Sequence, residues 1–260
     1  PNVVGAFGVG FQTYNLNQVS THFNNLQQSA RNSGAVSLTN GVFNRAMIDI
    51  QQIGNGSNVR VRLTNDINGV ASPTVTYLNH YVSGFVPYDS RIHFSGRTGG
   101  ADMTVDLDNI NVAYSNPYVA PPTISANTLS QDFDSLGTTL FTTVEGGTTP
   151  GPLVQTGGPT ANYLRLMTNV GSQNNRIAFD RAADGGVSNT LKATYDFRIN
   201  TSGNPGDGYS MLLLPTAAYG DRSGGAAFTA EEPNVAGAFG VGFDLYPSLN
   251  NVSLHWNNGQ

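Results

Sequence analysis

An internal repeat is the feature that most constrains how this sequence can fold. Residues 1–11 read PNVVGAFGVGF, and residues 233–243 read PNVAGAFGVGF. With one residue inserted in the second copy, the run VSTHFNN at 19–25 also matches the run VSLHWNN at 252–258. The offset of 232 to 233 residues is about the length of one large β-sandwich. We therefore expect two successive, diverged modules of a tandem array.

Short stretches of alternating apolar and polar residues predict half-buried β-strands along most of the chain. They lie at 46–51, 58–63, 74–78, 103–107, 191–199 and 235–244. The turn-forming clusters that separate them are Asn55-Gly, Asn68-Gly, Thr98-Gly-Gly and Asn204-Pro-Gly-Asp-Gly. This series predicts an all-β sandwich of two antiparallel sheets. The one stretch of helical length, 17–32, lacks a clean apolar stripe, so we expect a loop with a short turn there.

Composition supports this fold class and argues against several functions. Charged residues make up only 11% of the chain and Lys192 is the only lysine, so residues that favour exposed helices are scarce. The net charge of −5 argues against nucleic-acid binding, which needs a basic stripe. No apolar run is long enough to insert across a bilayer. Because the chain has no cysteine, disulfides and thiolate metal sites are excluded.

A proline pair within residues 118–124 predicts an extended linker between modules. Pro1 is not a natural start, so we expect a piece of a longer protein. The two halves on either side of the linker together supply one full set of strands plus a duplicated one. The predicted parts are the later half of one module at 1–118, the linker at 119–123, and the earlier part of the next module at 124–260, in which 233–260 repeats 1–25.

Several segments resemble the concanavalin A-like, L-type lectins. The run GDGYSMLLL at 206–214 is similar to the family's Ala-Asp-Gly-aromatic strand, and the glycine pair 224–225 follows at a comparable distance. The run VGFDLYP at 241–247 looks like the family's Val-Glu-Phe-Asp-Thr-Tyr-Pro strand. Residues 88–110 resemble its closing strands, and 131–136 its opening strand. The resemblance covers nearly the whole length and implies a concanavalin A-like jelly-roll sandwich of two antiparallel sheets.

The resemblance also implies two binding sites. In this family an aspartate, a glycine and an asparagine contact the sugar, and a calcium ion orders the loops around them. The corresponding sugar-binding residues here are Asp207, Gly225 and one of Asn250 and Asn251, with Tyr209 or Trp256 available to stack on the ring. The corresponding calcium (Ca2+) ligands are Asp244, the carbonyl of Tyr246 and Asn250 or Asn251.

The sequence departs from the family at several of these positions. Gly242 stands where the family has a metal-binding glutamate, and Gln12 stands where the first copy of the repeat should have the aspartate. His22 and His255 could replace a ligand, or could have ordinary side-chain or backbone partners. Asp207, in turn, could simply stabilise a Gly-Asp-Gly turn through a hydrogen bond of its own.

No set of residues in the sequence has the pattern of a catalytic site. Asp106 and Asp108 share one strand face, but Asp108 could cap a turn and Asp106 could be solvated or pair with an arginine such as Arg97. No serine lies in a Gly-x-Ser-x-Gly elbow. A sandwich glycosidase needs two carboxylates that flank a cleft, and no strand carries such a pair among Glu145, Glu231 and Glu232. We therefore expect that the protein is not an enzyme.

Two functions from different classes fit these observations. The first is a non-enzymatic structural module of an extracellular fibre, sheath or cell-surface protein, which assembles head-to-tail with copies of itself or with adjacent repeats. The second is a glycan-binding adhesin module, assisted by calcium. The repeat, the lysine-poor composition and the missing metal ligands favour the first. If the chain begins and ends within modules, a neighbouring copy could complete its open sheet edges.

Overall fold

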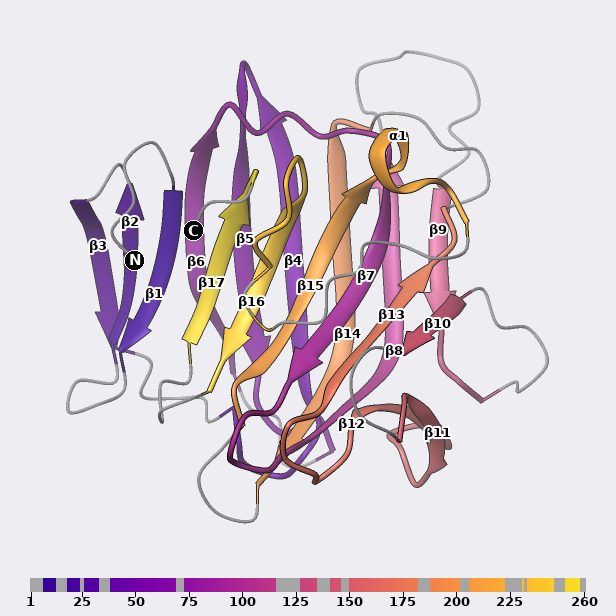
Figure 1. Ribbon diagram of the computed structural model, residues 1–260. Coiled ribbons are helices and arrows are strands. Elements are labelled where there is room, and N and C mark those ends of the chain that lie inside the picture. The colour runs from indigo at the N-terminus through magenta and orange to yellow at the C-terminus, as the bar shows by residue number, and fades with distance from the viewer. Residues whose placement is uncertain are drawn as a thin grey trace.

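Figure 1 shows the computed structural model of the chain. Within the described part the only helix is the single turn α1 (Thr216–Tyr219). None of the described helical structure is long and apolar enough to cross a membrane. The structure describes residues 7–12, 18–23, 26–32, 38–68, 73–115, 127–134, 141–145, 150–181, 188–201, 206–222, 231, 233–245 and 251–257.

Eight strands form the larger of two facing sheets. Their order is β11-β12-β8-β14-β4-β5-β6, with β9 paired onto β8, and all pairings are antiparallel. The bounds are β4 (Asn44–Ile53), β5 (Gly56–Thr64), β6 (Thr74–Ser83), β8 (Thr104–Ser115), β9 (Asn127–Gln131), β11 (Leu153–Thr156), β12 (Asn162–Met167) and β14 (Thr190–Asn200).

The facing sheet has six described strands in the order β10-β13-β7-β15-β16-β17, again antiparallel throughout. The segment 233–238 covers the outer face of β15, where Val235 and Ala238 pack against Leu212 and Leu214. The bounds are β7 (Ser90–Arg97), β10 (Phe141–Glu145), β13 (Asn174–Phe179), β15 (Gly208–Pro215), β16 (Phe239–Asp244) and β17 (Asn251–Trp256).

A smaller sheet of three strands contains the first copy of the repeat. Its members are β1 (Phe7–Gln12), β2 (Gln18–Phe23) and β3 (Leu26–Asn32), paired in that order and antiparallel. Figure 1 shows this three-stranded unit at the side of the sandwich, with β1 lying alongside β17.

Both large sheets draw strands from either side of residues 118–124. In one sheet β7 lies between β13 and β15, and in the other β14 lies between β8 and β4. The two predicted halves therefore interleave into one two-sheet sandwich, in which one half supplies neighbours for the other. The predicted linker 119–123 lies outside the described residues, and the division into module halves stays a prediction.

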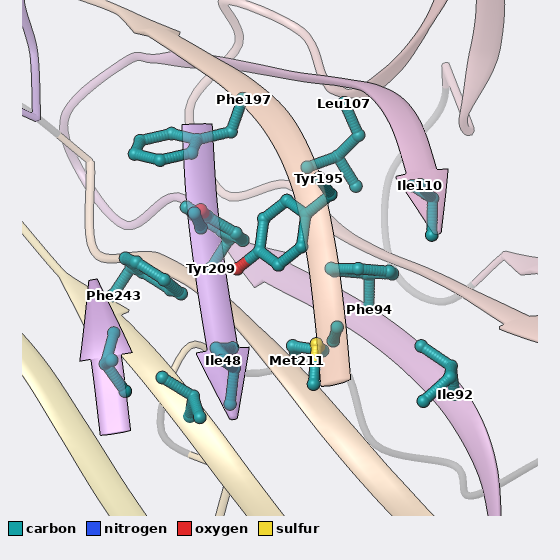
Figure 2. Close-up of a cluster of buried hydrophobic side chains, with 14 of the residues drawn as sticks. Ile48, Ile92, Phe94, Leu107, Ile110, Tyr195, Phe197, Tyr209, Met211 and Phe243 are labelled. Atoms are coloured by element: carbon teal, nitrogen blue, oxygen red, sulfur yellow. The ribbon is translucent and has the colours of Figure 1, made fainter. Parts of the chain in front are cut away.

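The core between the sheets follows from the period of two along each strand. In β14 one face consists of the buried residues Leu191, Ala193, Tyr195, Phe197 and Ile199. Figure 2 shows Tyr195 reaching from this strand toward the opposite sheet, where its ring meets Phe94 edge-on at 5.1 Å between centroids. Because every second residue of a strand points inward, aromatic side chains from both sheets meet in one layer between them.

The strands predicted at 46–51, 58–63, 74–78 and 191–199 are confirmed, as β4, β5, β6 and β14. The prediction at 103–107 is confirmed as the start of β8.

Three local predictions were wrong. Residues 17–32 hold strands β2 and β3 rather than a loop with a short turn. Residues 235–238 form a turn over β15, and β16 begins only at Phe239. The predicted opening strand ends at Gln131, because Phe133 has a positive φ of 61° and the amide of Asp134 donates to the side chain of Asp132.

Candidate functional site

One end of the six-stranded sheet brings together three of the predicted site residues, Asp207, Asp244 and Asn251. Arg97 on β7, Gly208 on β15, Asp244 on β16 and Asn251 on β17 face one another in register, strand to strand. Asp207 directly precedes Gly208, so it belongs to the same row. The row lies at the lower end of the sheet in Figure 1, where β7 and β16 end. The register therefore brings the backbone positions of Asp207, Asp244 and Asn251 together.

Several predicted residues cannot be placed in this site. Gly225, Tyr246 and Asn250 lie outside the described residues, as do the side chains of Asp244 and Asn251. Within the described part of the chain, no group of three or more His, Asp or Glu side chains could hold a metal ion. The predicted calcium site therefore stays a prediction, because its ligand atoms lie outside the described part of the structure.

Arg97 joins two carboxylates at this end of the sheet. Its Nε lies 2.8 Å from Oδ2 of Asp207, and its second terminal nitrogen lies 3.0 Å from Oε1 of Glu231. The side chains of Asp207 and Glu231 are 12% and 10% exposed, whereas that of Arg97 is 47% exposed. Asp207 is thus held by an arginine of the neighbouring strand, in addition to lying between two glycines. The backbone carbonyl of Asp207 also accepts a hydrogen bond of 2.7 Å from the amide of Leu245.

Glu231 is the member of this cluster that sequence reasoning missed. Burial raises its pKa, Arg97 lowers it, and the nearby charge of Asp207 raises it again. Its second oxygen, Oε2, is buried and has no hydrogen-bond partner. No local pattern marks Glu231, because it is 24 residues from Asp207 in the sequence and Arg97 on β7 bridges the two carboxylates. Together the three side chains offer acceptors and donors to a polar ligand such as a sugar hydroxyl.

Trp256 lies at the other end of the sheet from Asp207. It pairs with Phe239, which pairs with Leu213, five residues along β15 from Gly208. At the usual rise per residue this is a separation of about 17 Å. Trp256 is half-buried and packs on Phe85 and Tyr88, with ring centroids 5.0 and 5.8 Å apart. The structure therefore does not bring Trp256 and Asp207 into one sugar site.

Tyr209, the other aromatic considered for a sugar, lies in the core. It is fully buried and stacks on Phe243, with centroids 4.5 Å apart and planes within 4°. Figure 2 shows both rings among the apolar side chains between the sheets. Tyr209 therefore cannot reach a bound ligand.

His255 has an ordinary side-chain partner. Its Nδ1 lies 2.8 Å from Oδ1 of Asn234, and the ring is almost fully buried. Burial lowers the pKa of His255 to about 3, so the imidazole is neutral. The sequence left open whether His255 replaces a metal ligand or has an ordinary partner, and the structure shows an ordinary partner, Asn234.

Asp106 and Asp108 lie on the outer face of β8, and both are buried. Asp106 binds Arg165 and Arg198 at 2.8 and 2.7 Å, rather than Arg97, which binds Asp207 instead. Oδ1 of Asp108 accepts a hydrogen bond of 2.7 Å from the amide of Asn109. The bond lies within β8, at a register shift where Asn109 has a positive φ of 48°, and so the predicted turn cap is wrong.

The second oxygen of Asp108 lies close to Gly158. Oδ2 is buried without a partner, and a Cβ at Gly158 would approach it to 2.9 Å. Burial raises the pKa of Asp108 to about 7, the hydrogen bond from Asn109 lowers it, and the charges of Asp196, Asp134 and Asp132 raise it further. Asp106 therefore contacts arginines of its own sheet, whereas Asp108 keeps one buried oxygen without a hydrogen-bond partner.

No family model matches the chain, and the search of curated proteins gave no match.

Proposed function

We propose that this chain is a non-enzymatic structural repeat module of an extracellular fibre, sheath or surface protein, and that it assembles head-to-tail. One observation carries the proposal: the chain holds two copies of one hairpin with the same strand register. In β16–β17 the pairs include Phe239 with Trp256 and Phe243 with Val252. In β1–β2 the corresponding residues pair in the same way, Phe7 with Phe23 and Phe11 with Val19.

The match extends over the whole length of both hairpins. Asp244 pairs with Asn251, and its repeat counterpart Gln12 pairs with Gln18. Only β16–β17 takes part in the six-stranded sheet. A module that carries a second, equally registered copy of one of its own sheet hairpins has a ready means of continuing that sheet from copy to copy.

A finer assignment of the fold belongs with this proposal. The sandwich is a concanavalin A-like jelly roll, as the segments 88–110, 206–214 and 241–247 suggest. The antiparallel pairing within both sheets supports this assignment.

Sedimentation velocity of the chain over a wide range of concentrations tests the assembly. We expect a reversible series of species that lengthens with concentration, because a head-to-tail contact does not close after two copies. A single species of 27.5 kDa at every concentration would rule out the proposal.

Glycan binding is a second candidate, favoured by one observation: the cluster of Arg97, Asp207 and Glu231 at the end of the sheet, with a buried carboxylate oxygen that has no partner. A glycan array, run with and without a chelator, tests it. Binding that Asp207→Asn abolishes and Asp221→Asn leaves intact would support this candidate, since Asp221 is an exposed aspartate of another loop. Silence across the array would remove it.

A further inference from the structure

The geometry points to β17 as the strand through which one copy of the chain receives the next. In this contact the three-stranded unit β1–β3 of one copy lies along the β17 edge of a second copy and continues its six-stranded sheet. The inference rests on the proposed head-to-tail assembly and names the two surfaces that make it.

The β17 edge is a natural place for strand addition. Among the described strands, β16 alone pairs with β17 in register, through residues 239–244. The other edge of β17 faces away from β16, and the backbone of β1 from the same chain lies alongside it. An edge strand presents unpaired backbone groups that template the pairing of a further strand.

The strand that lies there is a repeat of β16, the strand that β17 already pairs with. Both read Phe-Gly-Val-Gly-Phe, so β17 lies between two copies of one sequence. In β16 the three apolar side chains, Phe239, Val241 and Phe243, are fully buried on the core face. Alternation with a period of two keeps such residues on one face, so the same pattern in β1 suits it to extend the same sheet.

Two further features of the hairpin are repeated along with its strands. Pro233 packs on Gly240, where an added Cβ would come within 2.4 Å of the proline ring, and Asn234 binds His255. The first copy has proline, asparagine, glycine and histidine at the equivalent positions 1, 2, 8 and 22. The repeat therefore preserves the residues that fix how this hairpin is built, and not only its apolar pattern.

The contact between β1 and β17 buries the same surfaces whether it forms within one chain or between two chains. Residues 33–37 separate β3 from Leu38, which is buried in the core, and can span about 17 Å when extended. The unit β1–β3 can therefore lie on its own β17 or on that of a neighbour and form the same contact. Exchange of an identical element between copies is a low-cost route to association. The two surfaces differ, so the contact is heterologous. Growth continues from copy to copy where each chain passes its unit to a new neighbour and does not exchange units with the previous one.

Cysteine crosslinking tests this contact cleanly, because the chain has no cysteine of its own. Two single variants, Gln12→Cys in β1 and Asn251→Cys in β17, are mixed at a concentration where the protein assembles. A short bis-maleimide is added, and the products are separated on a denaturing gel. A crosslink between the two variants can form only between chains. We expect a dimer band at least tenfold stronger in the mixture than with either variant alone.

Asp244→Cys provides the matched control. Asp244 is the repeat counterpart of Gln12, and it pairs with Asn251 inside the sheet of one chain. The double variant Asp244→Cys with Asn251→Cys should crosslink within the monomer, which shows that both positions accept the reagent. A mixture of the Asp244→Cys and Asn251→Cys single variants should give no dimer above either variant alone.

The outcomes separate this contact from the assembly itself. A strong mixed dimer from Gln12→Cys and Asn251→Cys supports the contact. If sedimentation still shows assembly and the mixed dimer is absent, the β1–β17 contact between copies is wrong while the proposed function stands. If the variants and the unmodified chain fail to assemble at any concentration, both are wrong.

Discussion

At the scale of single residues, the outer face of the eight-stranded sheet depends on buried carboxylates that arginines neutralise. Asp106 is fully buried between Arg165 and Arg198, and Asp196 is fully buried beside Arg45. The guanidinium of Arg198 also lies 4.5 Å from the ring centre of Phe43. Removing one partner of such a set leaves the other charges unpaired, which costs more than the pairing itself contributes.

Asp106→Asn should therefore lower the free energy of unfolding strongly, by about 2–4 kcal/mol, because two arginines lose one carboxylate. Asp49→Asn is the matched control, since Asp49 pairs with Arg60 and Arg62 at the surface with 23% of its side chain exposed. Such exposed pairs contribute about 0–1 kcal/mol. Urea unfolding of both variants checks the difference, and equal losses would contradict this view of the sheet.

Asp108 gives the protein a dependence on pH. Its pKa is raised to about 7 in the folded chain, against a usual value of 3.8. Between these values the folded state keeps a proton that the unfolded state has lost, so the contribution of Asp108 to stability falls as pH rises, by about 1.4 kcal/mol per pH unit. Burial lowers the pKa of His80 to about 4 and those of His93 and His255 to about 3, so these histidines act in the opposite direction in both the parent and the variant. The slope of the unfolding free energy between pH 4 and pH 7 should therefore be more positive in Asp108→Asn than in the parent, by about 1.4 kcal/mol per pH unit, and an unchanged slope would contradict the assignment.

The residues of the candidate site show how far sequence reasoning reaches. The resemblance assigned Asp207 to a sugar site, Asp244 to a calcium site and Asn251 to either, and the strand register brings their backbones into one row. The cluster with Glu231 could not be foreseen, because loop placement and the reach of Arg97 bring Glu231 to Asp207. Local sequence pattern contains no information on either.

At the scale of elements, the hairpins β1–β2 and β16–β17 have the same strand register but belong to different sheets. β16 lies inside the six-stranded sheet between β15 and β17, whereas β1 pairs with β2 in the separate unit. The sequence predicted β4, β5 and β14 through clean alternation, but β2 and β3 are rich in polar residues and gave no such pattern. The strand character of β2 could have been read from the repeat, because β2 corresponds to β17, whereas β3 has no counterpart in the second copy.

The same substitution in the two hairpins should have unequal effects. Phe243 is fully buried and stacks on Tyr209, so Phe243→Ala should cost about 3–5 kcal/mol of stability. Phe11→Ala changes the repeat counterpart, in a strand that does not pair with β15 or β7, and should cost less than about 1 kcal/mol. Thermal or urea unfolding of the two variants measures the two losses of stability. A loss with Phe11→Ala as large as with Phe243→Ala would show that the two hairpins occupy equivalent places.

At the scale of the whole molecule, residues 38–257 contain every strand of the two facing sheets. The core residues whose burial the structure describes also fall within this range. The unit β1–β3 lies at the β17 edge. We therefore assign stability to the sandwich and association to the unit β1–β3. These two assignments can be separated by removing the unit.

The most direct test is light scattering of the full chain beside a chain that lacks residues 1–32. We expect that the full chain grows in mass with concentration, while the shortened chain stays folded and monomeric, with an unfolding transition close to that of the full chain. A shortened chain that assembles as the full chain does, or that no longer folds, would contradict the claim that the duplicated hairpin serves assembly rather than the core.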